Sequence, residues 1–216
     1  MSNGGTIMTP FLTVANVRYV EAQLKKIVNS KLTTQDKDVL AAVKGIALSN
    51  IKETVSGVDQ SVLDAIEKVE DRIDAELLLE NLKAYTIPFH VISEKALEKL
   101  FRKDKKLKLP KLAQVDWKAI SYLSWVDVGS HRQYIVVEKD DQFIGLRGTV
   151  EPQYRTKGIC AICQKQGDVH LFTAKVKRNE EAFTTYSQYI CSDAERCNQQ
   201  LERHERIIEF VEGNLV

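Results

Sequence analysis

The stretch KGICAICQK (157–165), together with CSDAERC (191–197), decides how the second half of this 216-residue chain is expected to fold. The two segments hold all four cysteines of the chain, in the pairs Cys160-x-x-Cys163 and Cys191-x5-Cys197. A CxxC pair has the spacing of a metal knuckle, a tight turn in which two thiolates point at one ion. Two close pairs with no other cysteine predict a single metal site.

The sequence indicates the cellular compartment, and therefore whether these thiols are expected to be reduced. It has neither the cationic start and apolar run of a signal peptide nor a run of about 18 apolar residues that would cross a membrane. We therefore expect a soluble, cytoplasmic protein without membrane contact. Cytoplasmic thiols stay reduced, so paired cysteines favour metal binding or catalysis over disulfides.

The predicted cofactor is one structural Zn²⁺ ion, because four soft thiolates select tetrahedral zinc and leave no position for a catalytic water. A knuckle, a hairpin and a helix with the remaining ligands is the arrangement of a treble-clef zinc finger. Two alternatives stay open: His170 replaces one cysteine as ligand, or Cys160 and Cys163 form a redox pair. The predicted metal ligands are Cys160, Cys163, Cys191 and Cys197.

Residues 1–86 read as four amphipathic helices, which predicts an antiparallel four-helix bundle because each apolar stripe must be buried against another. The second helix is expected to follow Thr33, with Asp36 three residues on as a loose capping box, and the third runs from Asp59 to Ile73. The fourth ends before Pro88, since proline forces the preceding residue out of the helical region. The buried stripe expected for the second helix comprises Val39, Leu40, Val43, Ile46 and Ile51.

Residues 87–216 predict an α/β domain, so the whole chain is expected to be α+β. Ser93 caps a short helix, and the segments 133–138 and 142–150 flank a polar turn as a β-hairpin. Two further strands are predicted around 169–176 and 185–190. A single closing helix follows over 192–214, with Ser192 and Glu195 as a capping box and Gly213 at its C-terminal cap.

The segment 99–111 is the most basic of the chain, with seven basic residues and one acidic residue. It favours either a contact surface for phosphates and acidic partners or a solvated linker. The net charge of the chain is only +1. A protein that bound nucleic acid mainly through phosphate contacts would be expected to be far more basic.

A succession of motifs resembles the FusB-type fusidic acid resistance proteins over nearly the whole length. It consists of YTIPF (85–89), KKLKLPKL (105–112), KGICAIC (157–163), YIC (189–191) and a closing amphipathic helix. The resemblance implies a helical bundle followed by a four-cysteine zinc-finger domain. It also implies binding of elongation factor G through that domain, and removal of the factor from ribosomes on which fusidic acid has trapped it.

The partner-binding surface that the resemblance implies clusters around the zinc finger. Tyr189 and Phe210 match aromatic positions of the family pattern, whereas Ile159 stands where the family can have phenylalanine and Tyr186 where it can have lysine. Exposed aromatic side chains beside a rigid metal site are good interface anchors. The alternative is that Tyr189 and Phe210 pack in the core between the hairpin and the closing helix.

Three classes of function are compatible with these features to different degrees. The first is a monomeric protein that binds elongation factor G, on or off the ribosome. The second is a zinc-finger protein that binds nucleic acid, such as ribosomal RNA, with the 99–111 segment as its contact. The third is an enzyme, which the sequence disfavours because it contains no phosphate-binding, nucleotide-binding, serine-hydrolase or zinc-protease motif.

Overall fold

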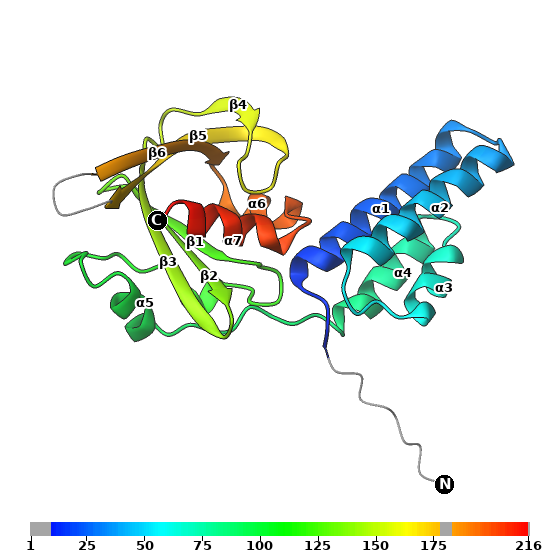
Figure 1. Ribbon diagram of the computed structural model, residues 1–216, viewed down its shortest axis with the longest axis horizontal. Helices are drawn as coiled ribbons and strands as arrows, with labels where there is room; N and C mark the ends of the chain where they lie inside the picture. Colours follow the sequence, from blue (N-terminus) through cyan, green and yellow to red (C-terminus); the bar gives the residue numbers. More distant parts are fainter. Residues whose placement is uncertain (1–9, 178–182, 216) are drawn as a thin grey trace, which may run out of the picture. The chain divides into compact units, whose positions relative to one another are not determined.

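The computed structural model describes residues 10–177 and 183–215, with the helices and strands labelled in Figure 1. Contacts between Cα atoms divide the chain into a helical unit that ends at Ile87 and a second unit that begins at Pro88. Among the described residues, no helix combines the length and the hydrophobicity that are needed to cross a bilayer.

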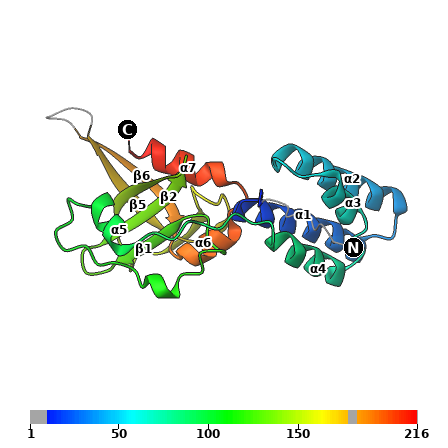
Figure 2. The same ribbon diagram turned by 90° about the horizontal axis from the view of Figure 1, so that it is seen from below.

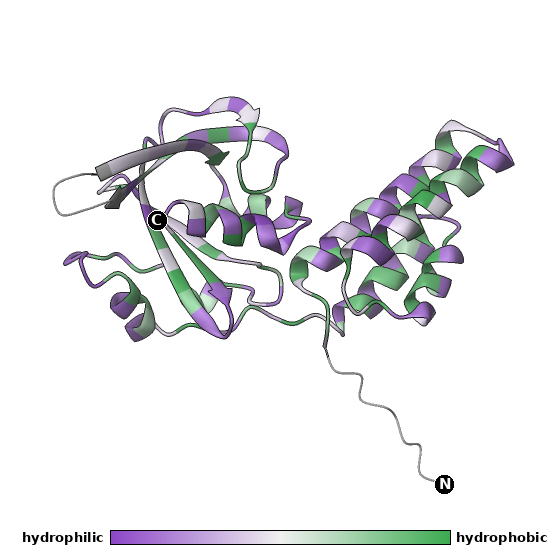
Figure 3. Ribbon diagram, in the orientation of Figure 1, coloured by the Kyte–Doolittle hydropathy of each residue, from purple (hydrophilic) through white to green (hydrophobic). Residues whose placement is uncertain are grey.

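The helical unit contains α1 (Val14–Thr33), α2 (Lys37–Thr54), α3 (Gln60–Glu67) and α4 (Arg72–Lys83). Each helix begins after a residue whose side chain accepts a hydrogen bond from the free N–H groups of the first turn. The helices carry alternating hydrophobic and hydrophilic bands in Figure 3, as amphipathic helices do. The four capping residues are Thr13, Asp36, Asp59 and Asp71.

Two details of the bundle differ from the sequence-based prediction. Val39 and Ile46 were expected in the buried stripe of α2, but both are exposed, and Ala47 is buried instead together with Ile51. The predicted third helix was too long, since α3 ends at Glu67 and Ile73 belongs to α4, where it is exposed. The α2 sequence has apolar residues on more than one face, and packing against α1 and α3 determines which of these faces is buried.

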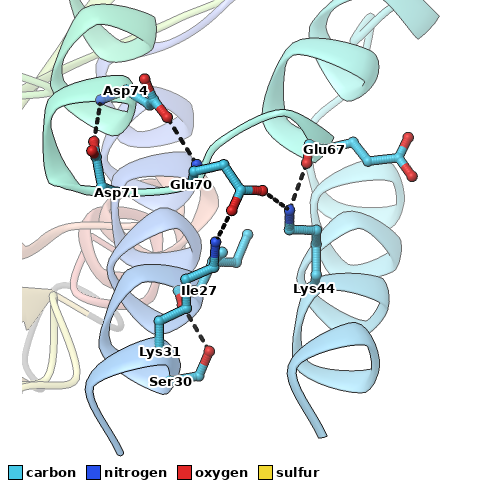
Figure 4. Close-up of polar contacts among 8 residues, drawn as sticks. All are labelled: Ile27, Ser30, Lys31, Lys44, Glu67, Glu70, Asp71 and Asp74. Carbon is cyan, nitrogen blue, oxygen red and sulfur yellow. Dashed lines mark hydrogen bonds and ion pairs between the residues drawn. The ribbon is translucent and has the colours of Figure 1, made fainter. Parts of the chain in front are cut away.

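The connection between α3 and α4 is fixed by Glu70, which lies between α1 and α2 (Figure 4). Its carboxylate accepts hydrogen bonds from Lys31 of α1 and Lys44 of α2. The Nζ of Lys44 also donates to the backbone oxygen of Glu67 at 2.6 Å, and the Glu70 N–H donates to Asp74 at 2.9 Å. One short connection is thereby linked to three helices.

The beginning and the end of the helical unit are joined by backbone hydrogen bonds. The N–H groups of Phe11 and Leu12 donate to the Tyr85 oxygen at 3.0 and 3.1 Å. The Ile87 N–H donates in turn to the Leu12 oxygen at 2.7 Å, and Leu12 and Thr86 form a parallel bridge. The chain therefore enters and leaves the bundle at adjacent positions.

The second unit is built on a curled antiparallel sheet of six strands in the order β1-β2-β3-β5-β4, with β6 paired to β5 (Figures 1 and 2). The helices are short, and α7 packs against β2 and β3. The strands are β1 (Leu123–Asp127), β2 (Arg132–Lys139), β3 (Gln142–Val150), β4 (Thr156–Ile159), β5 (Gln166–Lys177) and β6 (Phe183–Cys191). The helices are α5 (Glu94–Leu100), α6 (Ala194–Gln200) and α7 (His204–Gly213), with a short 3-10 turn at Leu112–Gln114.

The β2–β3 hairpin confirms the predicted strand pair and its polar turn. Asp140 and Asp141 both have positive φ values, 50° and 58°, as the two central residues of a tight hairpin turn require. One face of the sheet packs on α5 through an aromatic cluster in which the Tyr134 ring lies 4.9 Å from those of both Phe101 and Trp125. The fold class predicted from the sequence, a four-helix bundle followed by an α/β unit with a four-cysteine finger, is confirmed.

The single closing helix predicted over 192–214 is two helices. The chain leaves helical geometry at Leu201, which is extended and fully buried, and re-enters it at His204. Gly213 lies inside α7 rather than beyond it, and Asn214 is the C-cap. The break lets α6 and α7 run in different directions, which a continuous helix could not do.

Candidate metal centre

The structure brings the four cysteines of the sequence together in one buried cluster. Cys160 and Cys163 lie in the turn after β4, Cys191 ends β6, and Cys197 lies in α6. All four sulfur atoms lie within 4.8 Å of one another. The Sγ atoms of Cys160 and Cys197 are 3.7 Å apart, and so are those of Cys163 and Cys191.

These distances suit a zinc ion. A tetrahedron with Zn–S bonds of about 2.3 Å has sulfur–sulfur edges of about 3.8 Å, close to the observed spacing of 3.7 Å. The donor set is entirely thiol, which is the set that selects zinc over the hard cations magnesium and calcium. The residues present therefore fit a structural zinc ion.

The knuckle turn is held by its own backbone. The Cys160 N–H donates to the Lys165 oxygen at 3.1 Å, and the Gln164 N–H donates to the Cys160 oxygen at 2.9 Å. Gln164 has a positive φ of 59°, which lets the chain reverse within a few residues. The N–H groups of Ile162 and Cys191 point at the Cys160 sulfur, at 3.4 and 3.3 Å.

The second pair of cysteines is positioned by α6. Asp193, rather than the predicted Ser192, caps this helix by accepting hydrogen bonds from the N–H groups of Glu195 and Arg196. Asn198, next to Cys197, is buried and connects α6 to the chain before β1. Its Oδ1 accepts from the Ser121 N–H at 2.7 Å.

The four thiols cannot all ionise without a cation at their centre. Hydrogen bonds from the other thiols lower the pKa of Cys160. Hydrogen bonding to Cys160 and Cys163 raises the pKa values of Cys191 and Cys197, and burial and the nearby charge of Cys160 raise them further. Burial raises the pKa of Tyr122 beside them, and the neighbouring Cys197 raises it further. The site therefore calls for a metal cation that neutralises several thiolates together.

His170 lies outside the cysteine cluster. Its side chain is buried in the sheet, with Nε2 2.8 Å from Oε1 of Gln133, and burial lowers its pKa. His90 and His131 pair with Glu138 and Glu151 elsewhere on the second unit. His170 therefore does not replace a cysteine, and the ligand set consists of the four clustered cysteines.

The four residues implied as partner contacts lie in different environments. Ile159 of β4 is 65% exposed, and Tyr189 and Tyr186 of β6 are 48% and 38% exposed. Phe210 of α7 is only 7% exposed, with its ring 5.7 Å from that of Phe172. Ile159, Tyr186 and Tyr189 are therefore accessible at the surface, whereas Phe210 packs against the sheet.

Strand geometry separates the two tyrosines of β6. Tyr186 and Tyr189 are three positions apart, so their side chains project from opposite faces of the sheet. Leu171, opposite Tyr189 on β5 and 44% exposed, extends the apolar surface on its face. Leu171 could not be identified from the sequence, because only the β5–β6 register shows which residue lies beside Tyr189.

The basic segment 99–111 is ordered rather than a loose linker. Its one acidic residue, Asp104, is buried and binds Arg132 at 2.8 Å and Arg147 at 2.5 Å. The neighbouring Phe101 packs in the aromatic cluster under the sheet. The seven basic side chains of the segment are all exposed to solvent.

Comparisons with known proteins agree with this architecture. The family model "FBP C-terminal treble-clef zinc-finger" matches residues 95–212, and "Elongation factor G-binding protein, N-terminal" matches residues 11–90. The solved structure of the fusidic acid resistance protein FusC superposes with a TM-score of 0.82 at 32% identity, covering 97% of this chain and 100% of FusC. A search among curated proteins gave no significant match. A four-cysteine cluster in a domain of this family holds one structural zinc ion, and the chain belongs to the elongation factor G-binding family of treble-clef zinc-finger proteins.

Proposed function

We propose that this protein binds elongation factor G through residues 87–216 and promotes its release from ribosomes stalled by fusidic acid. The observation that carries the proposal is the position of exposed side chains on the elements that the zinc centre joins. Ile159 directly precedes a cysteine of the cluster, and Tyr189 lies two residues before Cys191. Zinc would hold the knuckle, β6 and α6 rigid, so that these side chains bind at little entropic cost.

Release requires that the protein distinguish two states of the factor. A ligand shifts an equilibrium only by the difference between its affinities for the two states. We propose that this protein binds more tightly to a conformation of elongation factor G with low affinity for the ribosome. Drug resistance then follows from protection of the target, in the cytoplasm, without chemical change to the drug.

Each implied contact residue has a role that suits its environment. Tyr189 and Ile159 contact the partner beside the zinc ligands, and Tyr186 contacts it farther along β6, on the face opposite to Tyr189. Phe210 is a positioning residue, because it packs on Phe172 under the sheet. A monomer is sufficient for this arrangement. Because four thiolates would fill the coordination sphere of zinc, we propose binding without catalysis.

The test is a titration of purified elongation factor G with the zinc-loaded protein. Tyr189→Ala is expected to weaken binding by about tenfold or more, as expected for an aromatic anchor. Tyr154→Ala is the matched control, because Tyr154 is also exposed but lies outside the proposed contact set. If Tyr189→Ala binds as tightly as wild type, the assignment of the surface is wrong.

The proposed release mechanism needs its own measurement. Ribosomes stalled with elongation factor G and fusidic acid are mixed with the protein, and the factor remaining on the ribosome is followed with time. Release should accelerate with wild type and much less with Tyr189→Ala. A protein that binds the free factor but leaves the stalled complex unchanged would contradict target protection.

A second candidate function is contact with ribosomal RNA. It is favoured by the ordered segment 99–111, in which Asp104 is turned inward and seven cations face solvent. Phosphate contacts weaken steeply with salt, by about one power of salt concentration per contact. Binding to an RNA hairpin that falls steeply between low and physiological salt, while binding to elongation factor G changes little, would support this function.

A further inference from the structure

Strand β6 forms a long edge of the sheet. It pairs with β5 over its whole length, and with no other strand among residues 10–177 and 183–215. Along one strand of an antiparallel pair, a residue whose N–H and C=O point at the neighbour alternates with one whose groups point away. The phase of this alternation decides which backbone groups of β6 face outward.

Two hydrogen bonds at the zinc end fix this phase. The Tyr189 oxygen accepts from the Ala161 N–H at 2.7 Å, and the Cys191 N–H donates to the Cys160 sulfur at 3.3 Å. Both bonds run to the knuckle, away from β5. The odd-numbered residues of β6 therefore carry the outward-facing groups.

Strand β5 gives the same phase from its own side. The Thr173 oxygen accepts from Oγ1 of Thr149 on β3, and the Asp168 oxygen accepts from the Ser192 N–H beyond the end of β6. The backbone oxygen of the odd-numbered Thr173 thus points away from β6, and that of the even-numbered Asp168 points toward it. The register continues without a bulge from Val169–Cys191 to Lys177–Phe183.

The same phase leaves Thr185 and Ser187 with outward-facing backbone groups. Within the described part of the chain, no backbone or side-chain group bonds to the N–H and C=O of these two residues on the outer side, or to the Tyr189 N–H. The residues from Thr185 to Tyr189 are all exposed. This stretch is an open row of donors and acceptors.

The other two edge strands of the sheet are protected in ways that β6 is not. Strand β1 has five residues and ends with Asp127, and β4 has four residues and includes Lys157. Short length and charged residues are the usual means of preventing strand addition at an edge. Strand β6 has nine residues, FTTYSQYIC, and none of them is charged. Its sequence leaves the edge open to pairing.

We propose that β6 accepts a short extended segment of elongation factor G as an additional strand of the sheet, an inference that rests on the proposed function. The segment bonds to the backbone of Thr185 and Ser187 and to the Tyr189 N–H. The knuckle already uses the Tyr189 oxygen, so it ends the added ladder at the zinc end. Main-chain bonds give affinity, and Tyr186 and Tyr189 select side chains on the two faces.

A second copy of this chain fits the same edge poorly. Antiparallel self-pairing centred on Ser187 would place Phe183 of the second copy beside Cys191, where the knuckle already lies. The pairing would stop after about five residues, far below the roughly 1,200 Å² that a stable interface buries. A short segment of a larger partner avoids this limit, because the rest of the partner reaches Ile159 and Leu171.

The first test compares Ser187→Pro with Ser187→Ala in the zinc-loaded full chain. Both variants lose the hydroxyl bond to Thr173, but only proline removes the outward N–H, which the β5–β6 ladder does not use. Ser187→Pro is expected to bind elongation factor G about tenfold or more weakly than Ser187→Ala. Equal affinities, with one zinc per chain in both variants, would overturn the proposal.

The second test measures amide hydrogen exchange by NMR and needs no substitution. In the free protein the amides of Tyr186 and Gln188 are expected to be protected by β5, and those of Thr185, Ser187 and Tyr189 to exchange fast. Saturating elongation factor G should protect the odd-numbered amides as well. This pattern supports strand addition even if Ser187→Pro fails to fold.

The possible outcomes separate this inference from the proposed function. If elongation factor G does not bind at all, the proposed function fails and this inference fails with it. If it binds but the odd-numbered amides still exchange fast, only strand addition is overturned. Protection of these amides in the free protein, with a dimer in sedimentation, would assign the edge to a second copy and also overturn it.

Discussion

Gly148 on β3 allows the aromatic ring of Phe172 to pack directly against the backbone of the strand. A Cβ atom at this position would lie 2.3 Å from Cζ of Phe172, far closer than two carbon atoms can approach. The Phe172 ring therefore lies directly over the strand, and Phe210 packs on its side. The glycine is needed for this close approach of ring to backbone.

Replacing Gly148 with alanine should lower the stability of the second unit by about 1–3 kcal/mol, the range for overpacked cores. Chemical denaturation followed by tryptophan fluorescence measures the change. Gly45→Ala is a control of opposite sign in the helical unit: no atom lies within 4 Å of the added Cβ, and alanine favours the helix. Its effect is followed by the helical circular dichroism signal, because both tryptophans lie in the second unit. An unchanged denaturation midpoint for Gly148→Ala would contradict this account.

Glu70 provides a prediction that depends on pH. Hydrogen bonding to Lys31 lowers the pKa of Glu70 below its usual 4.5, and Lys44 adds to the effect. A depressed carboxyl pKa stabilises the fold above the unfolded-state pKa, and this contribution is lost as the pH falls through the folded-state pKa. Glu70→Gln should therefore melt at a lower temperature than wild type at pH 7.

The difference between the two proteins should disappear in acid, once wild-type Glu70 is protonated as well. Thermal melts of both proteins between pH 7 and pH 3 provide the measurement. Because Glu70 is exposed to solvent, added salt should reduce the difference at pH 7. A difference that is the same at every pH would show that the carboxylate charge is not its cause.

At the scale of elements, α6 connects the metal centre to the rest of the second unit through Asn198. Its side-chain oxygen accepts from Ser121 and Tyr122, and its Nδ2 donates to the Tyr122 oxygen at 3.1 Å. Asn198→Ala leaves these buried backbone groups unpaired, at a cost of about 1–3 kcal/mol each. Transfer of zinc to a chromophoric chelator should become faster than in wild type.

The Asn198 prediction has a conservative control. Asn198→Asp retains an acceptor for the Ser121 N–H and loses the Nδ2 donor to the backbone oxygens of Tyr122 and Ala194. It is expected to release zinc at a rate between those of wild type and Asn198→Ala. If all three proteins release zinc equally fast, α6 is held by other contacts.

Elements with strong local signals were predictable from the sequence. The cap at Ser93 predicted a helix beginning, and the polar turn after Lys139 predicted a hairpin. The start of α2 was predicted three residues too early, since Thr33 belongs to α1 and Asp36 itself is the N-cap. The break between α6 and α7 has no such signal, since neither glycine nor proline occurs from 201 to 203. It is imposed by packing, because Leu201 is buried there and each helix contacts different strands.

The candidate site was predictable only in part, for a similar reason. Cysteine spacing alone was sufficient to place Cys160, Cys163, Cys191 and Cys197 in one cluster. The exposure of Tyr189 and the burial of Phe210 depend on strand register and on Phe172, which the sequence does not display. The open edge of β6 likewise depends on the phase of hydrogen bonding, which sequence alternation leaves undecided.

At the scale of the whole molecule, we predict that the two units respond differently to loss of the metal. Structural zinc in small fingers contributes about 10–16 kcal/mol, as much as the entire stability of a typical domain. Treatment with a chelator, or Cys163→Ser, should therefore unfold much of residues 88–216. The bundle has its own core and should still melt cooperatively.

Circular dichroism separates the two responses, because the helical signal of the bundle should persist while the near-ultraviolet signal of Trp117 and Trp125 is lost. Both tryptophans pack in the second unit. Zinc added back to the chelated wild-type protein should restore their signal, and zinc added to Cys163→Ser should not. One simultaneous transition of both units would contradict their independence.

The backbone bonds between residues 11–12 and 85–87 make the bundle suitable for insertion into another protein as a domain. Its first and last residues are adjacent, so the segment 11–87 can be inserted into a surface loop of an unrelated carrier protein without separating the two ends of that loop. Joining the same two ends by a short linker and cutting the chain between α2 and α3 would give a circular permutant with its helices in the original places.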